Sequence, residues 1–186
     1  MPELPDIELY LHALRQRVVG RKLLAVRIGS PFVLRSVEPT IDAAFGKEVV
    51  GVRRLGKRVV FELEGELFIV VHLMIAGRLR WKPPQQKIPA RMGLAAFDFD
   101  EGTLLLTEAS KKKRASIYVC RGDAALQEHD PGGIEPLRID LGTFRSALTA
   151  NNHTVKRALS DPRIFSGIGN AYSDEILHRA KLSPLT

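Results

Sequence analysis

The sequence predicts an α+β protein in which an N-terminal helix and an antiparallel β domain, either a sandwich or barrel-like, precede a helical domain. Three observations predict this order. Apolar residues recur at helical spacing at the start of the chain, short β-rich runs separated by turn residues fill its middle, and the helical period returns after a segment rich in glycine and proline.

The first helix is predicted to follow Pro5. Its apolar residues recur three or four positions apart and so share one face, which we expect to be buried; they are Ile7, Leu11, Leu14 and Val18. Gly20 stands where a C-terminal cap belongs, because glycine readily adopts the left-handed backbone that ends many helices.

The β domain is predicted between residues 23 and 120. Its β-rich runs include residues 49–55, 58–63, 67–73, 94–99 and 103–106. Two turns, Glu64-Gly65 and Glu101-Gly102, separate such runs at hairpin distance. Consecutive strands are therefore expected to pair antiparallel.

A connection between the two domains is predicted at residues 121–140, because Asp130-Pro131-Gly132-Gly133 and Pro136 interrupt regular structure. The expected domains are residues 1–120 and 141–186. The second domain has helical runs at residues 144–148, 155–159 and 171–181, with a glycine-rich turn at residues 166–170 between the last two.

Composition favours a polyanionic partner. The 186 residues are 45% hydrophobic, which is enough to bury one sizeable core or two modest ones. The formal net charge of +7 favours nucleic acid, since basic side chains displace condensed counterions on binding. Cations also cluster within residues 53–58 and 78–91, which indicates a basic face; solvated strand edges and loops are the alternative.

Other classes of protein are disfavoured. No apolar stretch is long enough to cross a bilayer, and no charged-then-apolar leader precedes the first helix, so we expect a cytoplasmic, nucleoid-associated protein without a membrane partner. Cys120 is the only cysteine, which excludes an intramolecular disulfide and a cysteine-rich zinc cluster within this sequence.

The N-terminal residues Met1-Pro2-Glu3 suggest a nucleophile. A small second residue should permit removal of Met1, which would leave Pro2 as a secondary amine that is partly unprotonated at neutral pH. Attack on a sugar's anomeric carbon would give an iminium ion that favours elimination, and Glu3 would act as the acid or base that opens the sugar ring. The structural alternative is that Pro2 and Pro5 simply lead into the helix.

The turn Gly167-Ile168-Gly169-Asn170 is a second candidate site. Glycines let backbone N–H groups converge on an anion at the start of a helix, and an asparagine amide can donate a further hydrogen bond. Basic residues, Lys156 among them, outnumber acidic ones around this turn. A plain connector between two helices is the alternative.

Together these segments resemble the formamidopyrimidine-DNA glycosylase and endonuclease VIII superfamily. Residues 1–8 are similar to its N-terminal catalytic signature, with Leu4 closer to the formamidopyrimidine branch. Four further segments match in the family's order: the lysine hairpin at residues 55–58, the damage-site loop at 72–77, the start of the helical domain at 152–156, and the helix-two-turns-helix element at 165–177.

The resemblance implies a β-sandwich domain and a bifunctional DNA glycosylase and lyase of base excision repair. Such an enzyme removes oxidised bases, here expected to be purines such as formamidopyrimidines and oxidised guanine, through an N-terminal proline Schiff base. The implied catalytic residues are Pro2 as nucleophile, Glu3 as general acid or base, and Lys57 as a cation that holds the phosphate beside the lesion. The implied DNA-binding residues include His72, Lys156, Gly167, Gly169 and Asn170. Taken singly, His72 is as consistent with a satisfied interior histidine, and Lys57 with a solvated hairpin lysine.

Two loops depart from the family's pattern. The family inserts a methionine through the duplex, but here Ile75 holds that place with Met74 one residue earlier, so either is a candidate wedge; strand packing is the alternative. Where the family has an Asp-Pro-Arg-Arg-Phe-Gly loop, residues 108–114 carry cations without an aromatic residue, namely Lys111, Lys112, Lys113 and Arg114. This substitution predicts backbone gripping with weaker reading of the opposite base, or a preference for unpaired targets, unless the loop is merely solvated.

The family's C-terminal zinc finger has no counterpart in this sequence. We therefore expect no metal or other cofactor in this chain and reduced affinity for duplex DNA. We expect a monomer whose partner is damaged DNA. A catalytically silent DNA-binding paralogue or fragment, which keeps the phosphate contacts without chemistry, is the alternative function.

Overall fold

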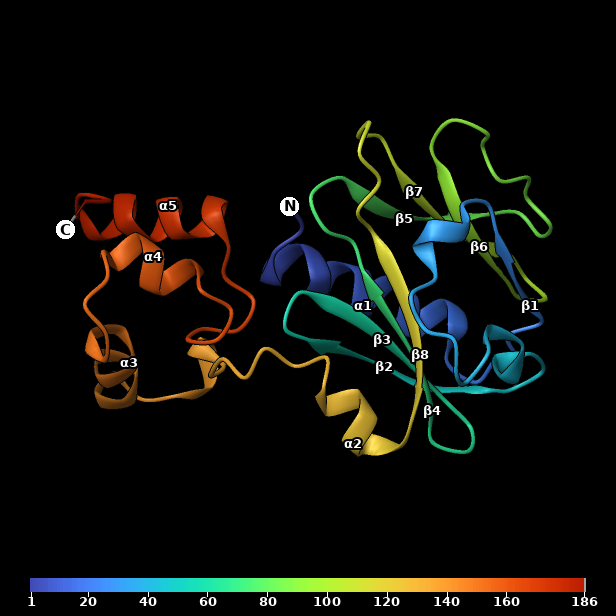
Figure 1. The fold of residues 1–186 in the computed structure, drawn as a ribbon, viewed down its shortest axis with the longest axis horizontal. Coiled ribbons are helices and arrows are strands. Elements are labelled where there is room, and N and C mark those ends of the chain that lie inside the picture. Colours follow the sequence, from blue (N-terminus) through green and yellow to red (C-terminus); the bar gives the residue numbers. More distant parts are fainter. Residues whose placement is uncertain (186) are drawn as a thin grey trace. The chain divides into compact units, whose positions relative to one another are not determined.

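A computed structural model describes residues 1–185 and divides the chain into two compact units (Figure 1). The first unit is Met1–His129 and the second is Asp130–Thr186. The strands lie in the first unit, and short helices form the regular structure of the second. Among the described residues, no helix is both long and apolar enough to cross a membrane.

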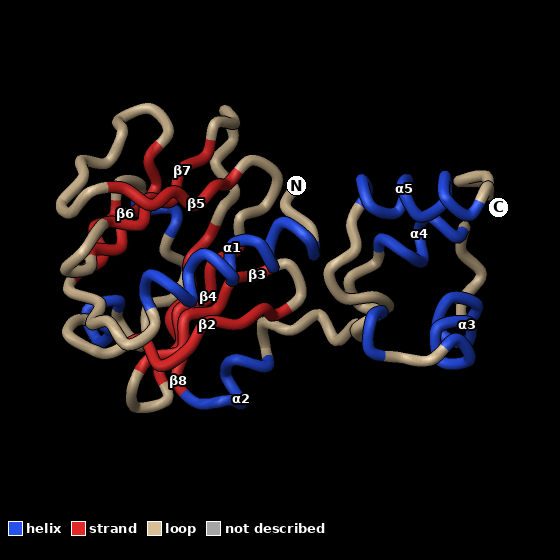
Figure 2. The backbone as a smooth tube through the Cα atoms, turned by 180° about the vertical axis from the view of Figure 1, so that it is seen from behind, coloured by secondary structure: helices blue, strands red, loops and turns tan. Residues whose placement is uncertain are grey.

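Helix α1, Leu4–Val18, opens the first unit and runs beside β2 and β3 (Figure 2). The four residues predicted to share its buried face, Ile7, Leu11, Leu14 and Val18, are all buried. At the start of the helix, the backbone N–H of Glu3 donates to the carboxylate of Asp6 at 2.9 Å. At its end Gly20 adopts a φ of +77°, as a residue beyond a helix terminus often does.

Two four-stranded sheets form the rest of this unit, and every pairing in them is antiparallel. The first has the order β1-β6-β7-β5, with bounds Ala25–Ile28, Gly93–Asp98, Thr103–Glu108 and Gly77–Lys82. The second has the order β2-β3-β4-β8, with bounds Val49–Leu55, Arg58–Leu63, Leu67–His72 and Ser116–Arg121. Short 3-10 helices, Pro31–Val33 and Ile41–Ala44, lie between β1 and β2.

The main core lies between the sheets, which confirms the sandwich. Phe61 of β3 and Phe97 of β6 stack across it with ring centroids 5.7 Å apart. The predicted hairpins β3–β4 and β6–β7 are antiparallel pairs, as their turns indicated. Strands β1, β5 and β8 lie outside the runs singled out from the sequence.

A second apolar cluster covers the outer face of the β2-β3-β4-β8 sheet. Helix α2, Gly122–Gln127, places Leu126 against Val60, Phe68 and Val70. Residues 121–129 therefore belong to the first unit, whereas the sequence placed them in a connection between domains. The difference arises because the residues that interrupt regular structure begin only at Asp130, whereas α2 contains the helix formers Ala124, Ala125, Leu126 and Gln127 and buries Leu126 against the sheet.

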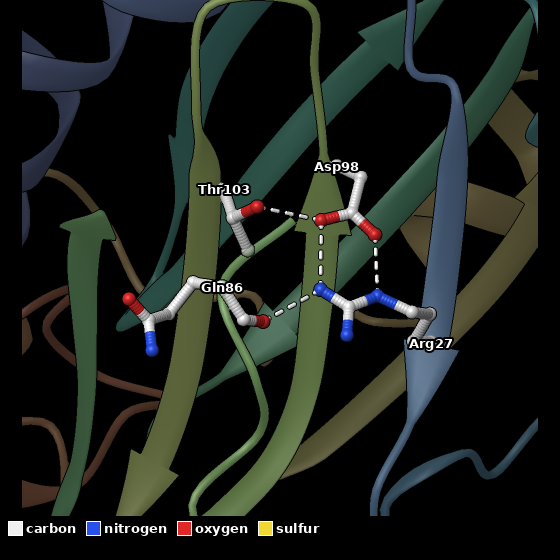
Figure 3. A network of polar contacts seen from close by, with 4 residues as sticks. All are labelled: Arg27, Gln86, Asp98 and Thr103. Carbon is white, nitrogen blue, oxygen red and sulfur yellow. Dashed lines mark hydrogen bonds and ion pairs between the residues drawn. The ribbon is translucent and has the colours of Figure 1, made fainter. Parts of the chain in front are cut away.

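An ion pair and the hydrogen bonds around it join strands β1, β6 and β7 at one edge of the first sheet (Figure 3). Arg27 of β1 donates to Asp98 of β6 at 2.6 and 3.0 Å and to the carbonyl of Gln86 at 2.7 Å, while the Thr103 hydroxyl donates to Asp98 at 2.6 Å. Burial alone would raise the pKa of Asp98, but the hydrogen bonds from Arg27 and Thr103 hold it below its usual value.

The second unit contains α3, α4 and α5, with bounds Leu141–Thr149, Val155–Ser160 and Asn170–Ala180, after a 3-10 turn at Pro136–Arg138. Its core consists of Leu159, Phe165, Ile168 and Leu177, and the Phe165 ring packs 4.8 Å from that of Phe144. The side chain of Asp140 caps α3 by accepting from the N–H of Thr143 at 2.7 Å. Helices α3 and α4 contain the runs predicted at residues 144–148 and 155–159. Helix α5 covers the predicted run 171–181 up to Ala180, and Lys181 follows it with a φ of +56°.

Candidate functional site

Pro2 and Glu3, the first two predicted catalytic residues, are buried within the first unit. Pro2 is buried, and Glu3 is only 2% exposed even though it carries a carboxylate. The Asp6 side chain fixes the backbone of Glu3 at the start of α1. Met1, which precedes Pro2, is 43% exposed. A carboxylate directly beside Pro2 is placed to act as a general acid or base at that residue.

Lys57 lies in the tight turn between β2 and β3. Burial lowers the pKa of Lys57 below its usual value, the negative charge of Glu3 opposes this effect, and the positive charge of Arg58 adds to it. Glu3 and Lys57 are therefore within electrostatic reach of each other, as the predicted catalytic set requires.

Arg54 ties the turn that carries Lys57 to helix α1. Its guanidinium donates to the carbonyl of Gly56 at 2.8 Å and to the carboxylate of Glu8 at 3.1 Å, and only 11% of the side chain is exposed. The sequence indicated Arg54 only as part of a basic cluster. No local pattern announces its contact with Glu8, which lies 46 positions earlier.

His72 ends β4 directly opposite Arg58 of β3. Burial and the positive charges of Arg58 and Lys57 lower the pKa of His72 from 6.5 to about 4. The imidazole is therefore neutral at physiological pH, so that it can donate or accept a hydrogen bond but brings no charge to a phosphate. Lys57 is therefore the residue whose charge acts on His72 and on which the charge of Glu3 acts in turn.

The turn after His72 presents Ile75 outward. Met74 is half-buried with a φ of +52°, whereas the Ile75 side chain is 54% exposed. The N–H of Gly77 donates to the carbonyl of Leu73 at 2.9 Å, and a side chain at Gly77 would place its Cβ 2.3 Å from the same oxygen. Of the two predicted wedge residues, Ile75 is the more exposed.

The basic loop at residues 109–115 lies next to this turn. Each end of the turn pairs with an end of the loop, since His72 is the cross-strand partner of Ser116 and Gly77 that of Glu108. Lys111, Lys112 and Arg114 are exposed. Lys113 is half-buried, and its ammonium donates to the backbone carbonyl of Glu108.

The predicted anion site of the second unit is the start of α5. Gly167 adopts a φ of +82°, Gly169 is the N-cap residue, and Asn170 is the exposed first residue of the helix. Helix N-termini favour anions through their N–H groups and dipole. Lys156 of α4 forms an ion pair with Asp174 of α5 at 2.6 Å, so its charge is partly balanced within the protein.

Comparison with known protein families decides the relationship. The formamidopyrimidine-DNA glycosylase N-terminal domain matches residues 1–114, and the formamidopyrimidine-DNA glycosylase H2TH domain matches residues 133–186. The chain belongs to the formamidopyrimidine-DNA glycosylase family. Membership places it among DNA glycosylases of base excision repair.

Individual members of the formamidopyrimidine-DNA glycosylase family support this assignment. The enzyme of Heliobacterium modesticaldum is 32% identical, over 99% of this chain and 69% of its own length. That of Carboxydothermus hydrogenoformans is 31% identical, over 99% of this chain and 67% of its own length.

Solved structures of the family agree with the fold. A variant of the Lactococcus lactis protein bound to Fapy-dG-containing DNA has a TM-score of 0.89 and 26% identity, with 100% of this chain and 69% of that chain covered. The L. lactis protein bound to DNA with an abasic site also has a TM-score of 0.89, at 25% identity, with 99% of this chain and 70% of that chain covered.

Proposed function

We propose that this protein, once Met1 has been removed, is a bifunctional DNA glycosylase and lyase that acts on oxidised purines. The secondary amine of Pro2 attacks the anomeric carbon of an everted nucleotide, and the damaged base leaves with the electrons of the glycosidic bond and takes up a proton. The amine then loses its proton, and protonation of the ring oxygen breaks the bond between that oxygen and the anomeric carbon, which opens the sugar and leaves an iminium. The iminium favours loss of a proton from the neighbouring carbon and of the 3′ phosphate as leaving group. Water then hydrolyses the iminium and regenerates the amine.

The observation that carries this proposal is that Pro2 and Glu3 are both buried and that the charge of Glu3 acts on Lys57. A carboxylate that is almost fully buried is costly unless it is compensated. Lys57 supplies an opposite charge in the turn that Arg54 holds against α1. The Glu3 side chain also accepts from the backbone at the start of α1, in the capping box that it forms with Asp6. In this position Glu3 can shuttle the proton that opens the sugar ring, while Lys57 holds the phosphate beside the lesion.

Three further elements support binding of damaged DNA. Ile75 is an exposed apolar side chain at a turn tip, which suits insertion between base steps when a nucleotide is extruded. The exposed cations Lys111, Lys112 and Arg114 suit phosphates, and so do the N–H groups at the start of α5 with Asn170 beside them. His72 would add a neutral hydrogen bond to the backbone.

Borohydride trapping tests the covalent step. Processed protein should be reduced onto an oligonucleotide with an abasic site and give a stable adduct, because borohydride reduces the iminium. Pro2→Gly should trap less, since it replaces the secondary amine by a primary one. Protein that retains Met1 is the matched control, because its Pro2 nitrogen is an amide and should give no adduct.

Failure of processed protein to form the adduct, with DNA binding intact, would favour the alternative of a catalytically silent DNA-binding protein. Substrate choice is tested separately by comparing excision of 8-oxoguanine, formamidopyrimidines and oxidised pyrimidines opposite each of the four bases. We expect purine lesions to be released fastest. We also expect a weak dependence on the opposite base, because the loop at residues 109–115 has no aromatic side chain to read it.

A further inference from the structure

Glu108, the last residue of β7, is a buried carboxylate outside the catalytic group. It is 1% exposed, although glutamate is rarely buried so completely. It stands at the start of the basic loop, and it pairs with Gly77 at the end of the turn that presents Ile75. Its position links two candidate DNA-binding segments.

Glu108 holds both ends of the loop. One carboxylate oxygen, Oε2, accepts from the backbone N–H groups of Arg114 and Ala115 at 2.8 and 3.0 Å. The other, Oε1, accepts from the Ser110 hydroxyl at 2.9 Å, and the backbone carbonyl of Glu108 accepts from the Lys113 ammonium. Hydrogen bonds to an ionised carboxylate are among the stronger ones in proteins.

These contacts determine which cations face solvent. Lys113 is drawn inward, while Lys111, Lys112 and Arg114 remain exposed. The Ser110 hydroxyl also lies 2.7 Å from the carbonyl of Lys112, which folds the loop back on itself. The result is a short cationic loop whose backbone is fixed from beneath by a single side chain.

We propose that Glu108 is a positioning residue that presents Lys111, Lys112 and Arg114 to the phosphodiester backbone of DNA. The proposal rests on the proposed DNA-binding function and adds a residue to it. It predicts a change in DNA affinity opposite in sign to the change expected from net charge alone. Removal of a negative charge should tighten binding to DNA if only charge matters, but it should weaken binding if the carboxylate holds the loop in its binding form.

Glu108→Gln is the main test. The amide keeps the size of the side chain but has no charge and one acceptor oxygen in place of two, so the charge-assisted hydrogen bonds from the N–H groups of Arg114 and Ala115 are weakened. The control is Asp98→Asn, which neutralises the other buried carboxylate of the same sheet, bound to Arg27 and Thr103 (Figure 3). Affinity is measured between about 50 and 200 mM salt on a duplex with one uncleavable abasic-site analogue.

We expect Glu108→Gln to bind less tightly and to make the slope of log K against log salt less negative by about 1 to 3, since each lost phosphate contact contributes about 0.9. Asp98→Asn should keep the wild-type slope. Ser110→Ala, which leaves every charge in place, should act in the same direction as Glu108→Gln but less strongly. Amide exchange at Arg114 and Ala115 should accelerate in Glu108→Gln even without DNA.

A double-mutant cycle identifies the route of the effect. If Glu108 acts through the loop, Lys112→Ala should cost less in the Glu108→Gln background than in the wild type. Unchanged or tighter binding by Glu108→Gln, or full additivity with Lys112→Ala, would overturn the positioning role. Absence of DNA binding by the wild type would instead refute the proposed function, and with it this inference.

Discussion

At His72, burial and two neighbouring cations act on one imidazole. Its pKa is about 4 in the folded protein and 6.5 in its ordinary state, so the unfolded chain takes up the proton first as the pH falls. The contribution of His72 to stability is therefore complete above about pH 6.5 and is lost progressively down to about pH 4.

His72→Gln should accordingly flatten the loss of stability between about pH 6.5 and pH 4. Urea unfolding at several pH values measures it, and His12→Gln on the exposed face of α1 is the matched control. A pH dependence that His72→Gln leaves unchanged would show that other groups control stability in this range.

At Glu3, removal of the charge should change both the rate of strand cleavage and the pKa of Lys57. Glu3→Gln should slow strand cleavage by about 10²- to 10⁴-fold, the usual value of a positioned acid or base. It should also lower the pKa of Lys57 further, since the charge of Glu3 now raises it. Single-turnover cleavage across pH measures both effects, with the exposed Glu66→Gln as control; cleavage at the wild-type rate would exclude the role.

At the same scale, the candidate site residues could be predicted from the sequence, but the contacts that hold their segments in place could not. Glu3, Lys57 and His72 could be named from their motifs, and the structure couples them electrostatically. The contact of Arg54 with Glu8 and the burial of Glu108 could not be inferred. They depend on which segments the two sheets bring together, and no local periodicity encodes that.

At the scale of elements, a substitution in the turn at residues 73–76 should reduce excision without changing the stability of the protein. Ile75→Ala should change the free energy of unfolding by less than about 0.5 kcal/mol, because the side chain is largely exposed. It should reduce excision from duplex DNA more than from unpaired DNA, where no base must be unstacked. Val37→Ala, at another exposed apolar position, is the control; equal losses on both substrates would contradict the wedge role.

Elements with a strong local signal were predicted well. Strands β2 and β3 and the buried face of α1 follow directly from residue pattern. Strand β5 was missed because Arg78, Arg80 and Lys82 alternate with inward-facing residues, so that charge concealed a period of two. Helix α2 was missed because it is short and stands directly before the glycine- and proline-rich residues from Asp130, although Ala124, Ala125 and Leu126 favour a helix.

At the scale of the whole molecule, separate cores predict separable unfolding. Phe165→Ala should destabilise the second unit by about 3 to 5 kcal/mol, because it empties the space beside Phe144 and Leu159. The transition reported by Trp81, the only tryptophan and a residue of β5, should stay where it is. Tryptophan fluorescence and amide exchange in α5 measure the two units in one sample.

Phe61→Ala in the sandwich core is the reciprocal variant and should shift only the tryptophan signal. A common shift of both signals in either variant would show that the two units unfold as one cooperative body.

The packing of α2 also determines where the first unit can be cut. A fragment that stops at residue 120 would lose Leu126 and uncover Val60, Phe68 and Val70 on the outer face of the sheet. An exposed apolar patch of this kind favours aggregation. The fragment that stops at residue 120 should therefore precipitate at concentrations at which a fragment ending at His129 remains in solution.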